Sequence, residues 1–145
     1  MSPATTALLS AAADLRLNPS PGFAATFPPC PSRVGEMRRR TASRLQAWKI
    51  PQRDAEDITL AVSELVTNSV VHGEGSVCFV LRQVANEIRV EVTDSNPQPA
   101  MVKNAGPDDI SGRGMFLAAV FARRIEVSDD GYTTTVAFPL SGHQR

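Results

Sequence analysis

Two runs rich in β-branched residues, 77–84 and 88–94, are separated by only three residues. So short a connection permits an antiparallel pair of strands, because a parallel pair needs a crossover of a dozen or more residues. In the second run apolar and polar side chains alternate, which predicts one buried face and one polar face. The apolar positions of that run are Ile88, Val90 and Val92.

Helical patterns surround this hairpin but do not alternate with strands as a parallel sheet requires. We therefore expect an α+β fold, with a mainly antiparallel sheet covered on one side by helices. The expected elements are a strand at 23–27, a helix from an N-cap at Ser32 to Pro51, a helix from an N-cap at Asp54 to His72 with Gly73 in the left-handed position after it, a long loop at 95–111, a helix at 115–123, and strands at 125–127 and 133–140.

The N-terminal segment has a different composition from the rest of the chain. Six of the eleven prolines lie within the first 31 residues, in a stretch rich in Ala and Ser. This composition favours a flexible Pro/Ala-rich arm over residues 1–22. The remaining residues, 23–145, are enough for one globular domain.

Charge and hydropathy exclude several classes of protein. The formal net charge is zero, so no global basic field favours direct binding to nucleic acid. No apolar run approaches the ~18 residues of a membrane span, and no Lys or Arg precedes Arg16, so neither a membrane segment nor a signal peptide is expected. Two cysteines, Cys30 and Cys78, suggest reduced thiols and not a disulfide framework. The expected location is the cytoplasm.

The helix expected over 54–72 carries polar residues beside its apolar face. With Glu64 at 0° on a helical wheel, the core residues fill an arc from about 60° to about 240°. Asn68 falls at about 40° and His72 at about 80°, so the three form a polar stripe at the edge of the core. Buried polar groups need partners, which favours a ligand site. The residues of the core arc are Ile58, Ala61, Val62, Leu65, Val66, Ser69 and Val70.

A purely structural interpretation of the stripe is also available. Glu64 can lie on a solvated edge, Asn68 can bond a neighbouring backbone group, and His72 suits the negative end of a helix. Asp94 shares a strand face with Val92 and should emerge on the core side, but Asp is also a common first residue of a turn.

Gly112, Arg113 and Gly114 stand at the expected start of a helix after the long loop. Paired glycines let a backbone approach an anion, and the free N–H groups of a first helical turn attract phosphate, to which Arg113 could add a charged contact. The same residues also suit an ordinary helix start with a flexible entry. The pattern is not a dinucleotide fingerprint, because the third glycine position is Leu117.

The order of these motifs resembles the N, G1 and G2 boxes of the GHKL ATPase superfamily. The resemblance rests on Glu64-Leu-Val-Thr-Asn68-Ser-Val-Val-His72-Gly73, then Asp94 at a strand end, then Gly112-Arg113-Gly114 at a helix start. It covers residues 23–140 and is strongest to the anti-sigma-factor serine/threonine kinases of the SpoIIAB and RsbW type, in an actinobacterial variant. It implies a Bergerat-type two-layer α/β sandwich that binds ATP and Mg²⁺.

The resemblance also implies roles for individual residues. Glu64 corresponds to the general base that activates a serine hydroxyl of a partner protein, and Asn68 to the Mg²⁺ ligand. His72 would line the pocket, and Asp94 would accept a hydrogen bond from the adenine amino group. Gly112, Arg113 and Gly114 would lie by the phosphates, and one of Thr133, Thr134 and Thr135, with Thr135 favoured, would match a strand threonine near the adenine.

The implied function is a regulatory anti-sigma factor and protein serine kinase. It would sequester a sigma factor and phosphorylate a serine of an anti-sigma-factor antagonist, a STAS-type protein, and a second copy of the chain is a further expected partner. One departure favours an alternative. The family places glycines second and fourth after the aspartate, whereas Asp94-Ser-Asn-Pro-Gln-Pro contains none. The alternative is a non-catalytic module of the same fold that acts only by sequestering a protein.

A basic segment lies before these motifs. Residues 30–53 carry seven basic side chains and one acidic side chain, a net charge of +6 that leaves −6 for the rest. Arg38, Arg39 and Arg40 would fan over about 200° of a helix, which is typical of a solvated face and not of a DNA-reading helix. As a hypothesis, this helix contacts an acidic partner surface or a second subunit.

Overall fold

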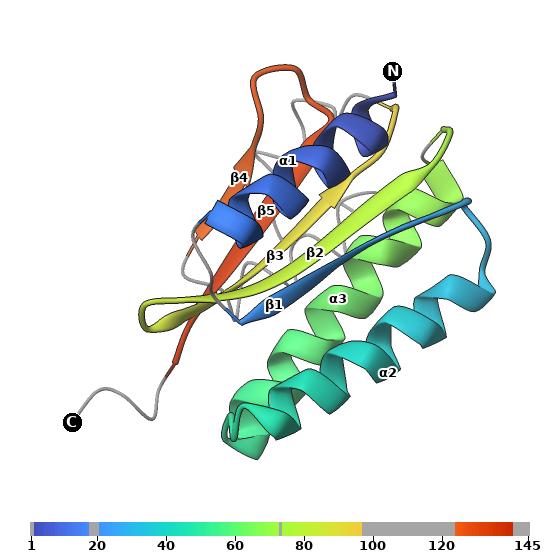
Figure 1. Ribbon diagram of the computed structural model, residues 1–145. Helices are drawn as coiled ribbons and strands as arrows, with labels where there is room; N and C mark the ends of the chain where they lie inside the picture. The colour runs from blue at the N-terminus through green and yellow to red at the C-terminus, as the bar shows by residue number, and fades with distance from the viewer. Residues whose placement is uncertain (1, 18–20, 73, 97–123, 141–145) are drawn as a thin grey trace.

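A five-stranded antiparallel sheet forms the centre of the computed structural model, which describes residues 2–17, 21–72, 74–96 and 124–140. The strand order is β1-β2-β3-β5-β4 (Figure 1). The α+β class and the antiparallel hairpin expected from the sequence are confirmed, whereas the helix expected at 115–123 lies outside the described residues. The elements are α1 (Pro3–Leu17), β1 (Gly22–Phe27), α2 (Ser32–Ala47), α3 (Gln52–His72), β2 (Val77–Val84), β3 (Glu87–Thr93), β4 (Arg124–Val127) and β5 (Thr133–Pro139).

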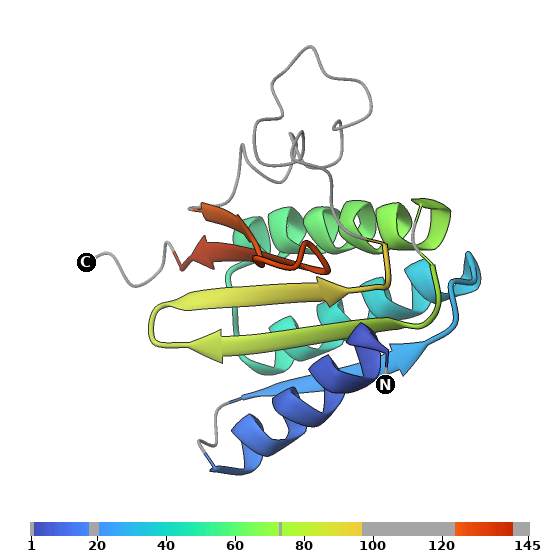
Figure 2. The ribbon, with the colours of Figure 1, turned by 90° about the horizontal axis from the view of Figure 1, so that it is seen from above.

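The period of two in the strands divides the side chains between two faces of the sheet. On β2, Phe79 and Leu81 point into the main core with α2 and α3, whereas Cys78 and Val80 pack against α1. Figure 2 shows α2 and α3 on one side of the sheet and α1 on the other. Large side chains that are fully buried in the main core include Phe27, Met37, Leu45, Ile58 and Phe79.

Both long helices start at positions other than the expected caps. Pro31 occupies the cap position of α2, in helical conformation and without a side-chain cap bond. Ser32 is the first helical residue, and its hydroxyl contacts the Cys30 sulfur at 3.3 Å instead of a backbone N–H. Helix α3 begins at Gln52, so Asp54 lies inside its first turn, where a negative charge favours the positive end of the helix dipole.

The N-terminal segment is a helix, so the expectation of a flexible arm is wrong for Pro3–Leu17. Its prolines bracket α1 and do not interrupt it, because Pro3 is the first helical residue, where a missing N–H is tolerated. The sequence feature that explains this helix is a stripe of small apolar residues at helical spacing, which packs against the sheet. Helix α1 thus adds cover on the face opposite α2 and α3. The stripe consists of Ala4, Ala7, Leu8 and Ala11.

In the part of the chain that the structure describes, none of the helices combines the length and the hydropathy that crossing a membrane requires.

Candidate functional site

Asp94 follows the last residue of β3 and is only 1% exposed. Its backbone N–H donates to the carbonyl of Tyr132 at 3.1 Å, which fixes the strand end against the chain entering β5. Its carboxylate accepts hydrogen bonds from the Ser69 hydroxyl of α3 and, at 2.8 Å, from the backbone N–H of Asn96. The carboxylate therefore lies on the α3 side of the sheet, as its position in the strand predicted.

Burial raises the pKa of Asp94 above its ordinary value, and the hydrogen bonds from Ser69 and Asn96 oppose that shift. A carboxylate offers about four lone-pair sites, and the two bonds to its oxygens leave acceptor capacity unused. An N–H donor of a ligand, such as an exocyclic amino group, fits that capacity. The site thus suits the adenine contact that the sequence resemblance implies.

Hydrogen bonds join the end of α3 to the segment that follows β3. The side-chain amide of Asn96 donates to the carbonyl of His72 at 2.6 Å, and the backbone N–H of Ser95 donates to the carbonyl of Glu74 at 2.9 Å. Gly75 makes this approach possible, because it has φ +68° and a Cβ there would lie 3.0 Å from the Ser95 hydroxyl. These contacts hold Asp94 at a fixed position beside α3.

Glu64 and Asn68 are both partly buried on α3. They are one turn apart, a rise of about 6 Å, on the flank next to the buried residues Ala61 and Leu65. Asn68 directly precedes Ser69, the residue that bonds Asp94. The structure therefore places the polar stripe of α3 and the buried carboxylate at the same end of the helix.

His72 differs from the expectation of a position facing the core. It is the last residue of α3 and its side chain is exposed. Only its carbonyl takes part in the local network, through Asn96. The helical wheel assumes that the helix continues, whereas α3 ends at His72 and the side chain is left exposed there.

The prediction for Thr135 is wrong about the face of the sheet. Thr135 pairs with Glu91, whereas Thr134 pairs with Val92, a core residue two positions before Asp94. Directly opposed residues in an antiparallel pair share a face, so Thr134 lies on the side of Asp94 and Thr135 on the side of α1. Thr134 is also the buried member, at 4% exposure.

Gly112, Arg113 and Gly114 lie outside the described residues. Among the described residues, sequence reasoning missed Ser69 and Asn96 as parts of the site. Ser69 carried a usable signal, because it lies near the middle of the apolar arc of α3 and a buried hydroxyl needs a partner. Asn96 carried none, since its partner is a helix carbonyl 24 residues earlier in the chain.

Comparison with protein families supplies the decisive observation. Residues 27–138 match the histidine kinase-like ATPase domain family. The chain belongs to this family. The match runs from the end of β1 to β5 and includes both α3 and Asp94, and it confirms the resemblance to GHKL ATPases. The fold of this histidine kinase-like ATPase domain is thus one that binds ATP.

Three solved structures share the fold at low sequence identity. The SiaB–SiaC complex from Pseudomonas aeruginosa matches at 13% identity and TM-score 0.61, covering 92% of this chain and 97% of that chain. The RsbU and RsbW domains of Rv1364c from Mycobacterium tuberculosis match at 20% identity and TM-score 0.57, covering 83% of this chain.

The histidine kinase domain of the blue-light-activated kinase EL346 from Erythrobacter litoralis matches at 23% identity and TM-score 0.51, covering 74% of this chain and 61% of that chain. The match to the Rv1364c structure covers 32% of that chain, about a third of its length. A search of curated protein sequences finds no match.

The buried carboxylate makes a testable prediction about stability. The pKa of Asp94 is higher in the folded state than in the unfolded chain. As the pH rises from the unfolded pKa through the folded pKa, the unfolded chain loses the proton first, and the free energy of unfolding falls. We expect Asp94→Asn, which removes the buried charge, to unfold at a higher temperature than wild type at pH 7. Thermal unfolding from pH 3 to pH 8 measures this difference.

Below the ordinary aspartate range both states of the wild type carry the proton, so the difference should disappear there. The control is Asp129→Asn, at an exposed turn position, which should change the free energy of unfolding by less than about 0.5 kcal/mol at every pH. A destabilised Asp94→Asn at pH 7 would show that the charged form is favoured in the fold, contrary to this argument.

Proposed function

We propose that this ATPase domain binds Mg·ATP, sequesters a sigma factor and phosphorylates a serine of a STAS-type anti-sigma-factor antagonist. The observation that carries the proposal is the burial of the Asp94 carboxylate at 1% exposure beside Ser69 of α3, the helix that holds Glu64 and Asn68. Phosphoryl transfer requires a protein mainly to position the reacting groups and to stabilise charge. A carboxylate, a metal ligand and a buried hydrogen-bond acceptor can together perform these tasks.

Each residue then has a distinct task. Bound ATP would supply the phosphoryl group. Asp94 would accept a hydrogen bond from the adenine amino group, with Thr134 beside it in place of Thr135. Asn68 would hold Mg²⁺ through its side-chain oxygen. Glu64 would take the proton from the serine hydroxyl of the antagonist, and Gly112, Arg113 and Gly114 would bind the phosphates through backbone N–H groups and a guanidinium.

Two structural relatives support action through partner proteins. SiaB is solved in complex with SiaC, and the RsbW domain of Rv1364c is solved together with an RsbU domain. We extend this to an antagonist and a sigma factor as partners of the present chain, with a second copy of the chain as a further partner.

A second candidate function is sequestration without catalysis. It is favoured by the segment after Asp94, in which Asn96 and Gln98 stand where the family pattern has glycines. Under this alternative, the affinity for a sigma factor would be the same in ATP as in ADP. A nucleotide-dependent affinity would favour the kinase.

The first experiment is thermal unfolding with and without Mg·ATP. A ligand at one hundred times its dissociation constant adds about 2.7 kcal/mol, which should raise the melting temperature of a domain of this size by several degrees. Asn68→Ala should abolish the shift, because it removes the proposed metal ligand. The matched control is Thr67→Ala, at the exposed neighbouring position of α3. No shift of the wild type at millimolar Mg·ATP would contradict the nucleotide site.

A further inference from the structure

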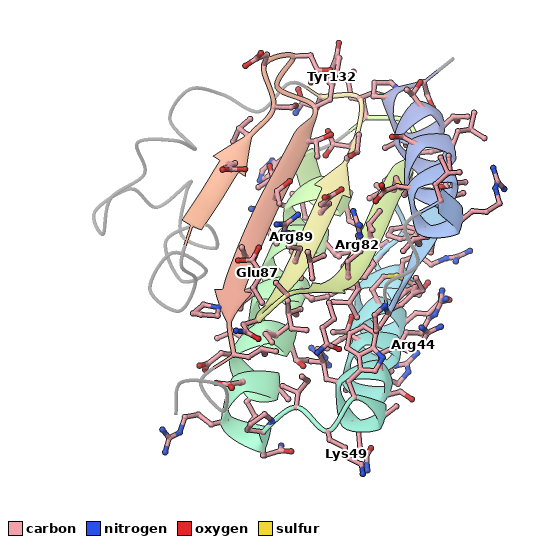
Figure 3. The ribbon with its side chains drawn as sticks, turned by 60° about the vertical axis from the view of Figure 1, so that its left-hand side comes forward. Arg44, Lys49, Arg82, Glu87, Arg89 and Tyr132 are labelled. Carbon is pink, nitrogen blue, oxygen red and sulfur yellow. The ribbon has the colours of Figure 1, made fainter. Side chains whose placement is uncertain are left out.

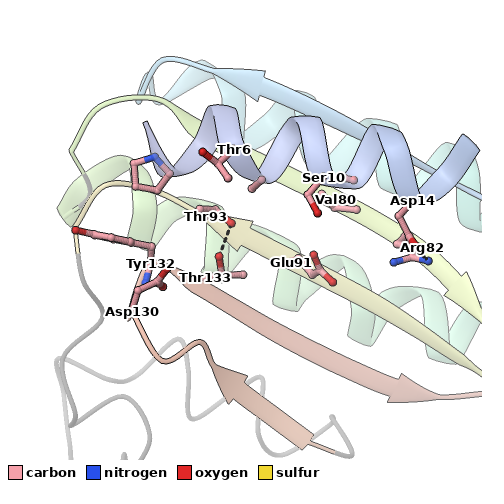
Figure 4. A pocket seen from close by; sticks show the side chains of 13 residues that line it. Thr6, Ser10, Asp14, Val80, Arg82, Glu91, Thr93, Asp130, Tyr132 and Thr133 are labelled. Atoms are coloured by element: carbon pink, nitrogen blue, oxygen red, sulfur yellow. Dashed lines mark hydrogen bonds and ion pairs between the residues drawn. The ribbon is translucent and has the colours of Figure 1, made fainter. Parts of the chain in front are cut away.

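A second concave site lies on the face of the sheet opposite Asp94. It is a groove of about 650 Å³ between α1 and the exposed side of β2, β3 and β5 (Figure 4). This volume is within the range of small-molecule sites, about 300–1,000 Å³. One wall is the polar side of α1, where Thr6, Ser10 and Asp14 follow each other at intervals of one turn. The described residues of the proposed nucleotide site, Glu64, Asn68 and Asp94, are not among its described lining residues.

The groove carries an excess of negative charge. Its lining includes three carboxylates, Asp14, Glu91 and Asp130, and one guanidinium, Arg82. Arg82 is bound to Asp14 at 2.6 Å, so that pair is neutral. Among the lining residues that the structure describes, Glu91 and Asp130 are the carboxylates that remain beside this pair.

Glu91 is the most unusual of these groups. It stands on the groove floor in β3, and none of the described residues forms an ion pair with it. Burial raises the pKa of Glu91, and Arg82 and Arg89 lower it. Arg89 forms an ion pair with Glu87 at 2.6 Å (Figure 3). A positively charged ligand would therefore stabilise the charged form of the half-buried Glu91 carboxylate.

Hydrogen-bonding and aromatic groups continue along the groove from Glu91. Thr93 is two residues further along the same face of β3, about 7 Å away, and its hydroxyl bonds that of Thr133 at 2.8 Å. Tyr132 and Asp130 follow at the end of the groove (Figure 4). An aromatic ring beside a carboxylate favours an organic cation, which the ring face attracts.

The two carboxylates that Arg82 does not neutralise are spread along the groove. Glu91 lies in its middle and Asp130 at its end (Figure 4). The described residues contain no cluster of three potential ligands that could hold a metal ion. A flexible chain with separated ammonium groups suits carboxylates at different points of one groove, because one ammonium group can contact each carboxylate and the hydroxyl groups can accept hydrogen bonds from the N–H donors between them.

We propose that this groove is a binding site for a linear aliphatic polyamine. One ammonium group contacts Glu91 and the hydroxyl groups of Thr93 and Thr133, and a second contacts Asp130 beside the ring of Tyr132. This site uses α1, the opposite face of the sheet and the turn between β4 and β5. It adjoins the nucleotide site only through the Tyr132 carbonyl, which accepts a hydrogen bond from the backbone N–H of Asp94 among the described contacts.

Calorimetric titration of the full chain with spermidine in 150 mM salt tests the proposal. Glu91→Gln removes one anchor with almost no change in shape and should weaken binding about tenfold, as expected for the loss of a charge-assisted hydrogen bond. Asp130→Asn lies at an exposed turn and keeps an oxygen that can accept the hydrogen bonds from the Ser128 hydroxyl and the Tyr132 N–H, and it should weaken binding to a similar degree. The control Glu56→Gln removes the same charge from the exposed surface of α3 and should leave the affinity unchanged.

Further ligands separate a polyamine from other cations. Butylamine, with a single ammonium group, should bind at least tenfold more weakly than spermidine. Equal affinities for the two amines would overturn the proposal, as would equal losses in Glu91→Gln and Glu56→Gln or the absence of heat at 150 mM salt. Tighter binding of a lysine peptide than of spermidine would also overturn it, because the site would then be a protein interface.

Discussion

Glu64→Gln should reduce phosphotransfer from ATP to the antagonist serine by a factor of about 10²–10⁴, the usual contribution of a general base. Glutamine keeps the shape of the side chain but cannot take a proton from a hydroxyl group. Glu64 lies on the partly buried flank of α3, one turn before Asn68, so the substitution should leave the metal ligand and the helix in place. Transfer of labelled phosphate to a cognate antagonist measures the rate.

Glu56→Gln is the matched control for catalysis. It makes the same chemical change on the same helix, two turns earlier at an exposed position. The control should transfer phosphate at the wild-type rate, and both variants should keep the thermal shift by Mg·ATP. If Glu64→Gln and the wild type transfer equally, Glu64 is not the base. If neither labels any antagonist, sequestration becomes the favoured function.

Phe79→Ala should lower the free energy of unfolding by about 3–5 kcal/mol, the range for a large aromatic residue removed from a core. Phe79 is fully buried in β2, between β1 and β3, and its ring packs against Phe23 with centroids 5.7 Å apart. The cavity would lie in the middle of the sheet, where paired strands on both sides limit collapse. Urea unfolding monitored by circular dichroism measures the change.

Leu60→Ala is the control for stability. Leu60 is 38% exposed on α3, so its truncation should cost less than about 1 kcal/mol. A similar cost for the two variants would contradict the placement of Phe79 in the core.

Local patterns predicted most of the sheet. The alternation in residues 88–94 and the short connection before it depend only on near neighbours, and they predicted the hairpin and the inward direction of Asp94 correctly. The strand that pairs with β3 on its other side comes 40 residues later. Its register depends on tertiary packing, so the sequence alone did not show that Thr134, and not Thr135, shares the face of Asp94.

The N-terminal helix shows a different reason for error. Proline content suggested an arm without regular structure, whereas the positions of Pro3 and the later prolines define the ends of α1. The site shows a third reason. Helical geometry placed Glu64 and Asn68 on one flank, but the bond between Asn96 and His72 joins residues far apart in sequence. The local sequence carries no signal for such a contact.

The arginines of α2 also protect the outer edge of the sheet. The carbonyl of Pro21 accepts a hydrogen bond from the backbone N–H of Gln83 on β2, so the next carbonyl, that of Gly22, points away from β2. Arg44 donates to the Gly22 carbonyl at 3.1 Å. Arg40 and Arg44 both lie over the ring of Phe23 in the same uncharged edge strand. Two copies that met along this edge would bring like charges together. High salt, which screens charges beyond a few ångströms, should therefore promote self-association of the chain.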